Sequence, residues 1–278
     1  MVFGKIASLF GGAAPAPDRS GDDKYHVWNA GDPAAHPRFA IDRARMFDLS
    51  LTQKLTDLLA VAADARDDRW YADFHPSAWN ASIELPAEPW FKGPDGFEYL
   101  RLNIPEAGRP FESNSLANLA LDCLNRGAGA VLFPEPAAEA PGYVFPMGVI
   151  DCMMRFDDWR GDPLDLEEMA RGAGQPGESL LVGSPSADFL PPYTARALYR
   201  RMKADWAIGE PRVQLIVQAR SAPSRSLVVN RRFGELGSDE VAQYFCASLG
   251  WHLPPGRPIT LLPDGWKEKD MSPLADLF

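Results

Sequence analysis

The chain has 278 residues, 46% of them hydrophobic and 24% charged, a balance typical of globular proteins. At about 150 residues per domain, this length predicts two domains. A formal net charge of −10 argues against a nucleic-acid partner, because an acidic surface repels phosphate. Three widely spaced cysteines argue against a disulfide framework or a zinc site and favour a reducing, cytoplasmic location.

The first segment, residues 1–46, is expected to be flexible, because residues 11–24 are small, polar and proline-bearing. Lys5 and the Gly11-Gly12 pair interrupt the apolar stretch that a signal peptide would need. The segment is either a frayed tail or a short amphipathic element that docks weakly on a membrane or a partner protein. The apolar residues on its one face are Val2, Phe3, Ile6, Leu9 and Phe10.

A first α+β unit is predicted over residues 47–156. Apolar residues at helical spacing between Leu51 and Ala62 predict its first helix. Alternation of apolar and polar residues predicts a strand over 79–85. The turn sequence Gly93-Pro-Asp-Gly then joins this strand to a second one over 97–104, in a hairpin.

The rest of the first unit is expected to contain one helix and two short strands. The helix begins at Ser113 and continues to Asn125, and the strands occupy 130–133 and 143–150. An acidic, glycine-rich stretch, residues 157–179, is predicted to be the linker between the units.

A second α+β unit, residues 180–278, repeats the order helix, strand, turn, strand, helix, strand. Its final helix begins at Ser238, and the turn is placed at 221–224. Duplication and convergence of two common layouts both explain the repeat. The fold class is therefore α+β, with two tandem related units, each a small mixed or antiparallel sheet with helices packed on it. The helices and strands of this unit are expected over 195–206, 213–218, 226–230, 238–249 and 259–265.

Four collinear segments between about residues 50 and 265 resemble the SseB family, the enhanced serine sensitivity proteins of bacteria, which carry an N-terminal and a C-terminal SseB-type unit. The resemblance implies an intracellular regulatory or accessory protein and no catalytic residues. Residues 137–176 are longer and looser than the family pattern. The four segments are Leu55-Thr-Asp-Leu-Leu-Ala with Trp70-Tyr-Ala-Asp-Phe, Pro110-Phe-Glu-Ser-Asn-Ser-Leu, Gly177-Glu-Ser-Leu-Leu-Val-Gly-Ser-Pro, and Pro255-Gly-Arg-Pro-Ile-Thr-Leu-Leu.

Catalytic, metal and cofactor motifs are missing from the sequence, so we predict none of these sites. His26 and His36 lie in the flexible start, and His75 and His252 are interpreted as surface or capping residues. No Gly-x-Ser-x-Gly, Walker or G-x-G-x-x-G pattern occurs in a suitable context. Two basic stretches are interpreted as a solvated helix face and a strand end; they contain Arg196, Arg200, Arg201 and Lys203, and Arg231 and Arg232. The acidic residues Asp157, Asp158 and Asp162 are interpreted as a solvated loop rather than a cation site.

Aromatic residues next to prolines are the candidate binding residues. Trp90 and Phe91 sit beside a turn, and Pro191-Pro192-Tyr193 precedes a helix. Exposed aromatic side chains in rigid loops are typical anchors of protein interfaces, although local packing of the loop explains them too. We therefore predict a non-enzymatic regulatory protein that binds another protein. The alternatives are a sensor with a small-molecule pocket between the two units and a hydrolase with a dispersed site.

Overall fold

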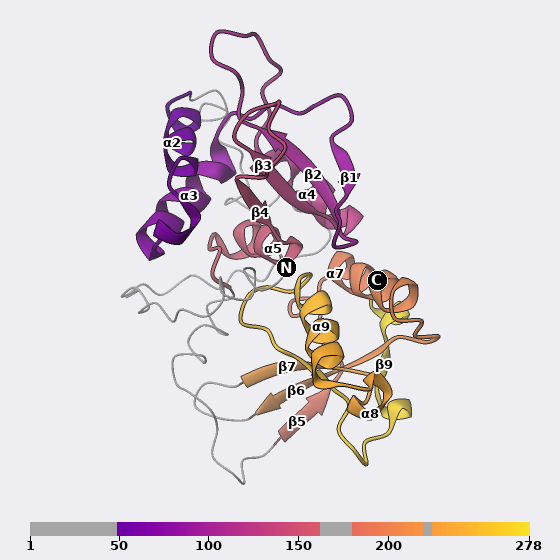
Figure 1. Ribbon diagram of the computed structural model, residues 1–278. Helices are drawn as coiled ribbons and strands as arrows, with labels where there is room; N and C mark the ends of the chain where they lie inside the picture. Colours follow the sequence, from indigo (N-terminus) through magenta and orange to yellow (C-terminus); the bar gives the residue numbers. More distant parts are fainter. Residues whose placement is uncertain (1–48, 162–179, 219–223) are drawn as a thin grey trace, which may run out of the picture. The chain divides into compact units, whose positions relative to one another are not determined.

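The computed structural model describes residues 49–161, 180–218 and 224–278 (Figure 1). They form two compact units that divide the chain between Trp159 and Arg160, and each contains helices and a mixed sheet. The predicted α+β fold of two units is confirmed. The expectations for residues 1–46, for most of the linker and for the turn at 221–223 fall outside the described residues.

The first unit begins with α2 (Leu49–Leu59), the short 3-10 helix η4 (Ala63–Ala65) and α3 (Asp68–Asn80). Helix α3 begins at an Asp67 cap, whose carboxylate accepts from the backbone N–H of Trp70. The strand predicted over 79–85 is therefore wrong at its start. Its later residues Ile83 and Glu84 form only isolated bridges.

Four strands form the sheet of the first unit in the order β1-β2-β3-β4. A turn at Gly93 joins β1 and β2 in an antiparallel hairpin, and Gly93 N–H donates to the Phe97 carbonyl. The predicted turn is confirmed, but the first strand of the hairpin is β1 rather than 79–85. Strand β3 runs parallel to β2, and β4 pairs antiparallel with β3. The strands are β1 (Trp90–Lys92), β2 (Glu98–Asn103), β3 (Gly129–Phe133) and β4 (Tyr143–Phe145).

Helix α4 (Leu116–Arg126) connects β2 to the parallel β3, and α5 (Met147–Phe156) follows β4. The strand predicted over 143–150 is wrong after residue 145. Pro146 has no N–H for a ladder, and its carbonyl accepts from the backbone N–H groups of Val149 and Ile150, so a helix begins there.

The second unit has the sheet order β5-β6-β7-β8, and the two-residue β9 also pairs with β6. Helix α9 connects β7 to the parallel β8. Helices α7 and α9 cover one sheet face, where a large apolar core includes Val213, Leu198 and Phe245. The elements are β5 (Leu180–Gly183), α7 (Pro192–Ala204), β6 (Arg212–Gln218), β7 (Ser224–Val229), α8 (Phe233–Leu236), α9 (Asp239–Gly250), β8 (Ile259–Leu261), η5 (Glu268–Asp270), β9 (Ser272–Pro273) and η6 (Leu274–Leu277).

Both units contain an antiparallel hairpin, a crossover helix and a third strand parallel to the second. The crossover helices also begin alike. Ser115 accepts from Asn118 N–H at 3.3 Å, and Ser238 accepts from Val241 N–H at 3.3 Å. Ser115, and not the predicted Ser113, is therefore the cap of α4. The repeated element order is confirmed, while an origin by duplication stays a prediction.

Candidate functional site

Within the described residues, the sheet of the second unit has an unpaired edge at β5. Among the described residues, β5 pairs on one side only, with β6. Two of its apolar side chains are exposed, Leu181 at 60% and Val182 at 44%. Successive side chains of a strand point to opposite faces, so these two flank the edge on both sides of the sheet. The strand sequence Leu-Leu-Val-Gly has neither the charge nor the proline that commonly protects an edge.

A shallow depression of about 290 Å³ lies beside Val182. Val182 pairs with Ile216, which packs on a small apolar cluster separate from the core under the helices. The depression therefore opens on the sheet face opposite α7 and α9. We call residues 263–273 the covering segment, because they cross this face and form the far wall. The residues around the depression are Val182, Gln214, Gly265, Trp266, Lys267 and Asp270.

Arg232 holds the beginning of the covering segment. Its guanidinium donates to the carbonyl of Pro263 at 2.7 Å and to that of Trp266 at 2.5 Å. Charge-assisted bonds to two carbonyls fix the turn that carries Trp266 into the wall of the depression.

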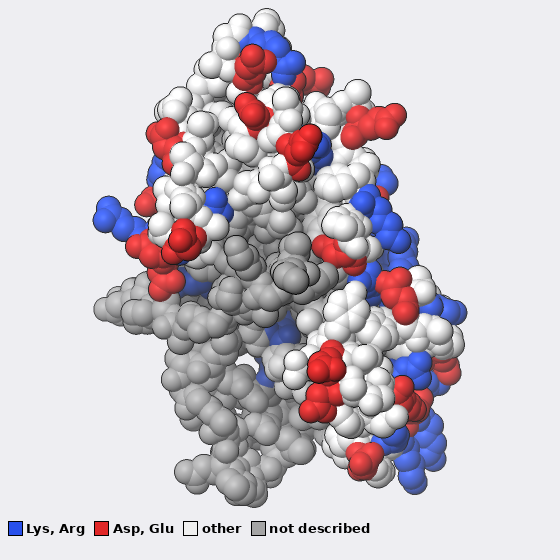
Figure 2. Space-filling view, in the orientation of Figure 1, with Lys and Arg blue, Asp and Glu red and all other residues white. Residues whose placement is uncertain are grey.

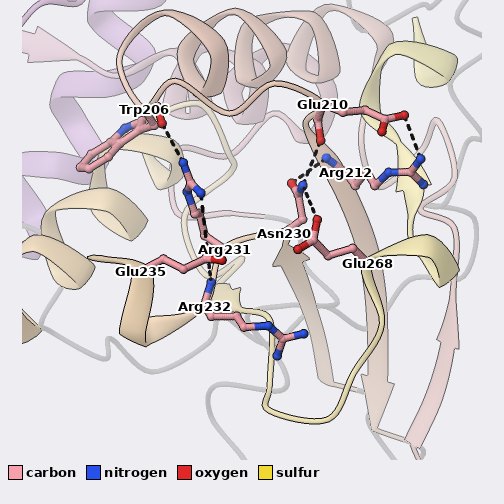
Figure 3. Close-up of polar contacts among 8 residues, drawn as sticks. All are labelled: Trp206, Glu210, Arg212, Asn230, Arg231, Arg232, Glu235 and Glu268. Atoms are coloured by element: carbon pink, nitrogen blue, oxygen red, sulfur yellow. Dashed lines mark hydrogen bonds and ion pairs between the residues drawn. The ribbon is translucent and has the colours of Figure 1, made fainter. Parts of the chain in front are cut away.

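Arg212 and Asn230 hold the end of the covering segment (Figure 3). Arg212 donates to the Met271 carbonyl at 2.9 Å and pairs with Glu210 at 2.8 Å. The buried Asn230 accepts from the backbone N–H of Arg212 at 2.8 Å and donates to a carboxylate oxygen of Glu268 at 3.3 Å. The wall is thus tied to β6 and β7 by side chains, which makes the depression a preformed feature.

Arg231 belongs to the same polar group but points toward α8 and the end of α7 (Figure 3). It donates to the Trp206 carbonyl at 3.0 Å and lies 3.5 Å from the Glu235 carboxylate. Glu235 also accepts from the backbone N–H of Arg232 at 3.0 Å. The pair predicted as a strand end therefore has a structural role, since both guanidinium groups bond to backbone carbonyls.

Trp90 and Phe91, two of the predicted binding residues, lie in the edge strand β1 and not in a loop. The guanidinium of Arg126 covers the Trp90 ring at 4.3 Å, and Phe91 stacks on Tyr99 with ring centroids 5.8 Å apart. Phe91 is 37% exposed, so this pair offers a smaller apolar surface than β5 does.

The other predicted binding residues, Pro191, Pro192 and Tyr193, begin α7. Pro191 is buried, Pro192 is half-buried and Tyr193 is only 5% exposed. The expectation of an exposed aromatic anchor is wrong here, because the first turn of α7 places Tyr193 in the interior. The sequence features that mark β5 instead are three successive apolar residues with no charge among them.

His75 is buried and makes two hydrogen bonds, so its interpretation as a surface residue in a loop is wrong. It lies inside α3, and its Nδ1 is 2.9 Å from the Tyr71 carbonyl oxygen, which can only accept. Nδ1 therefore carries the proton, and Nε2 accepts from the Tyr143 hydroxyl at 3.0 Å. The ring stacks on Trp159 at 4.6 Å. Burial lowers the pKa of His75 to about 4, although the Tyr71 carbonyl and Asp158 oppose the shift.

His252 is also buried, at 3% exposure, and its pKa is lowered to about 3 by burial and by the charge of Arg201. All three cysteines are free thiols, and burial raises the pKa of Cys123 to about 12. A neutral imidazole can serve as a base, but the ring of His75 has a carbonyl and a phenol as its hydrogen-bond partners. The hydrolase alternative therefore has no support at His75.

In the part of the chain that the structure describes, no group of three or more His, Cys, Asp or Glu side chains is placed to hold a metal ion. Of the acidic residues considered in the sequence, Asp158 is buried, Asp157 ends α5 and Asp162 lies outside the described ranges. Nor does any helix within those ranges have the length and apolar content to cross a bilayer.

Comparisons with models of protein families, with curated protein sequences and with solved structures found no match to this chain. The resemblance to the SseB family therefore stays a prediction. Within the described residues, β5 with its adjoining depression is the site that the geometry favours.

Proposed function

We propose that this protein acts without catalysis, by adding an extended segment of a partner protein to the open edge of β5. Main-chain hydrogen bonds supply affinity in this mode of recognition, and alternate side-chain contacts supply specificity. The observation that carries the proposal is an uncharged edge strand with exposed Leu181 and Val182 beside a preformed depression. The proposal includes a cytoplasmic location, which the free thiols support. It also includes a relationship to the SseB family, which the four collinear segments support.

The geometry of β5 defines the partner segment. The partner side chain on the Val182 face points toward the depression, and the next one along points toward the Leu181 face. A segment with two successive apolar residues contacts both exposed side chains. Proline within it would remove a ladder hydrogen bond, so we expect a partner segment without proline.

The test is a selection of phage-displayed random dodecapeptides on the full chain, followed by fluorescence anisotropy of the enriched peptides. We expect the enriched peptides to share two successive apolar residues and to lack proline. Methylation of alternate peptide nitrogens should weaken binding at least about tenfold, because it removes the donors of the ladder.

Two variants locate the peptide. Val182→Lys places a charge on an exposed position of β5 and should weaken binding about tenfold. Phe91→Lys makes the same change on β1 and should leave the affinity unchanged. If only Phe91→Lys lost binding, the peptide would bind at β1 and not at β5. If methylation of the peptide nitrogens left the affinity unchanged, strand addition would be ruled out.

A further inference from the structure

Helix α7 presents a basic and aromatic face that the β5 site does not use. Arg196, Tyr199, Arg200 and Lys203 fall at the spacing that lines up side chains along one side of a helix. Arg200 and Lys203 are exposed, and Arg196 and Tyr199 are half-buried. In Figure 2, Lys and Arg side chains gather over the position of α7, with a carboxylate group among them.

No ion pair joins Arg196, Arg200 or Lys203 to a carboxylate among the described residues. Arg201, on the next position of the same helix, lies 2.6 Å from Asp205 and shows that α7 can form such pairs. Most other arginines of the described ranges bind a carboxylate or a backbone carbonyl. Those with a carboxylate partner are Arg109, Arg126, Arg155, Arg201, Arg212, Arg231 and Arg232.

Aromatic rings, rather than carboxylates, position two of the three cations. The Arg196 guanidinium lies 5.6 Å from the Phe278 ring, and the Lys203 ammonium lies 5.3 Å from the Tyr199 ring and donates to its hydroxyl. The Tyr199 and Phe278 rings meet edge to face at 5.6 Å. Cation–π contacts hold the charge without neutralising it, so the face stays available to an anion.

We infer that this face of α7 binds an acidic helical segment of a partner protein. Arg196 and Lys203 are seven positions apart, about 10 Å along the helix axis, which matches acidic residues two turns apart on a second helix. The 43% exposed Phe278 and the half-buried Tyr199 add apolar contact between the cations. An anionic membrane or a nucleic acid fits less well, because polybasic recognition of lipid uses about four to eight cations and the net charge here is −10.

The probe is a fluorescein-labelled helical peptide with Glu at every third or fourth position and Leu and Ala between. A peptide with Gln in place of each Glu is the control. We expect the full chain to bind the Glu peptide at 20 mM salt, and the affinity to fall at least about fivefold at 200 mM as screening increases. The Gln peptide should bind at least about tenfold more weakly.

A matched pair of triple variants then locates the site. Arg196→Gln, Arg200→Gln and Lys203→Gln together should weaken binding of the Glu peptide at least about tenfold. The control combines Arg69→Gln, Lys92→Gln and Lys269→Gln, which removes the same number of exposed charges elsewhere and should change the affinity less than about twofold.

Equal losses in both triple variants would overturn the inference, because only net charge would then matter. Tighter binding to phosphatidylserine vesicles or to a DNA duplex than to the Glu peptide would overturn it as well. Circular dichroism checks that each variant is folded. The α7 variant should still bind the peptides selected for β5, so failure of this inference and failure of the proposed function give different results.

Discussion

The two units share a hairpin, a crossover helix and a parallel third strand. They differ in whether other strands pair with the first strand of the hairpin. In the first unit this edge is β1, three residues long, with Pro89 before it and Lys92 at its end. In the second unit the equivalent strand, β6, is covered by β5 and β9. Among the strands that the structure describes, the outer edge is therefore β5, where Leu181 and Val182 are exposed.

This difference shows that equivalent topology does not give equivalent surfaces. Proline and lysine protect β1 against further pairing, as they do on many natural edge strands. Strand β5 has neither, and the covering segment beside it forms one wall of a depression. The comparison favours β5 over the aromatic pair of β1 as the binding edge.

The largest expected effect concerns an i,i+4 ion pair that each unit holds. Asp151 and Arg155 on α5 are buried, with side chains 0% and 3% exposed, whereas Arg201 and Asp205 are 9% and 38% exposed. Asp151→Ala should lower the free energy of unfolding of the first unit by about 3–5 kcal/mol, because it removes one partner of a buried ion pair together with both charge-assisted bonds that Asp151 accepts from Arg155. Asp205→Ala should cost about 0.5 kcal/mol in the second unit.

Native-state hydrogen exchange measures both changes, because it reports the opening free energy of each unit separately in the full chain. Equal and small effects of the two substitutions would mean that the Arg155 charge does not depend on Asp151, and would remove this contrast between the units.

Acid should destabilise both units through their buried histidines. In the first unit, His75 stays neutral in the folded state down to a pKa of about 4, while the unfolded chain takes up a proton near pH 6.5. The unfolded state therefore binds more protons in this window, and stability falls as the pH is lowered from 6.5 to 4. The loss is on the order of 3 kcal/mol. His252 extends the same loss in the second unit to about pH 3.

Hydrogen exchange and urea unfolding between pH 7 and 4.5 measure this slope. His75→Gln keeps a hydrogen-bonding side chain that does not titrate, and it should flatten the pH dependence of the first unit while leaving that of the second unchanged. A slope that persists in His75→Gln would assign the acid sensitivity to other groups.

Much of the fold follows from local patterns in the sequence. The apolar periodicity of α2, α4 and α9 and the short buried strands β2, β3 and β7 correspond to elements of the structure. The misplaced elements lie where two local signals compete. Alternation near Trp79 indicates a strand, but the Asp67 cap and the buried face of Trp70 and Phe74 extend α3 to Asn80. Apolar residues after Pro146 suit either a strand or a helix, and the proline selects the helix.

The site is less predictable because it depends on contacts between distant residues. Strand β5 is absent from the elements expected from the sequence, because three apolar residues make too short a pattern, and its pairing with β6 is what defines it as an edge. Trp90 reads as an exposed anchor until Arg126, 36 positions later, is found over its ring. Position in the sheet and distant cover decide exposure, and neither is encoded in a local pattern.

The smallest expected effect is the loss of stability when the N-cap serine of a crossover helix is removed. The caps of α4 and α9 are alike in geometry but not in burial. Ser115 is 1% exposed and Ser238 is half-buried, and each accepts from its helix at 3.3 Å. Ser115→Ala should cost about 1–2 kcal/mol, because the buried start of α4 loses a side-chain acceptor that water cannot replace, while the Asn118 N–H keeps its 3.1 Å bond to the Ser115 carbonyl. Ser238→Ala should cost about 0.5–1 kcal/mol, since water reaches the end of α9 and the acidic residues of its first turn still favour the helix dipole. Opening free energies from hydrogen exchange in α4 and α9 measure both values, and a larger loss at Ser238 would show that burial does not set the strength of these caps.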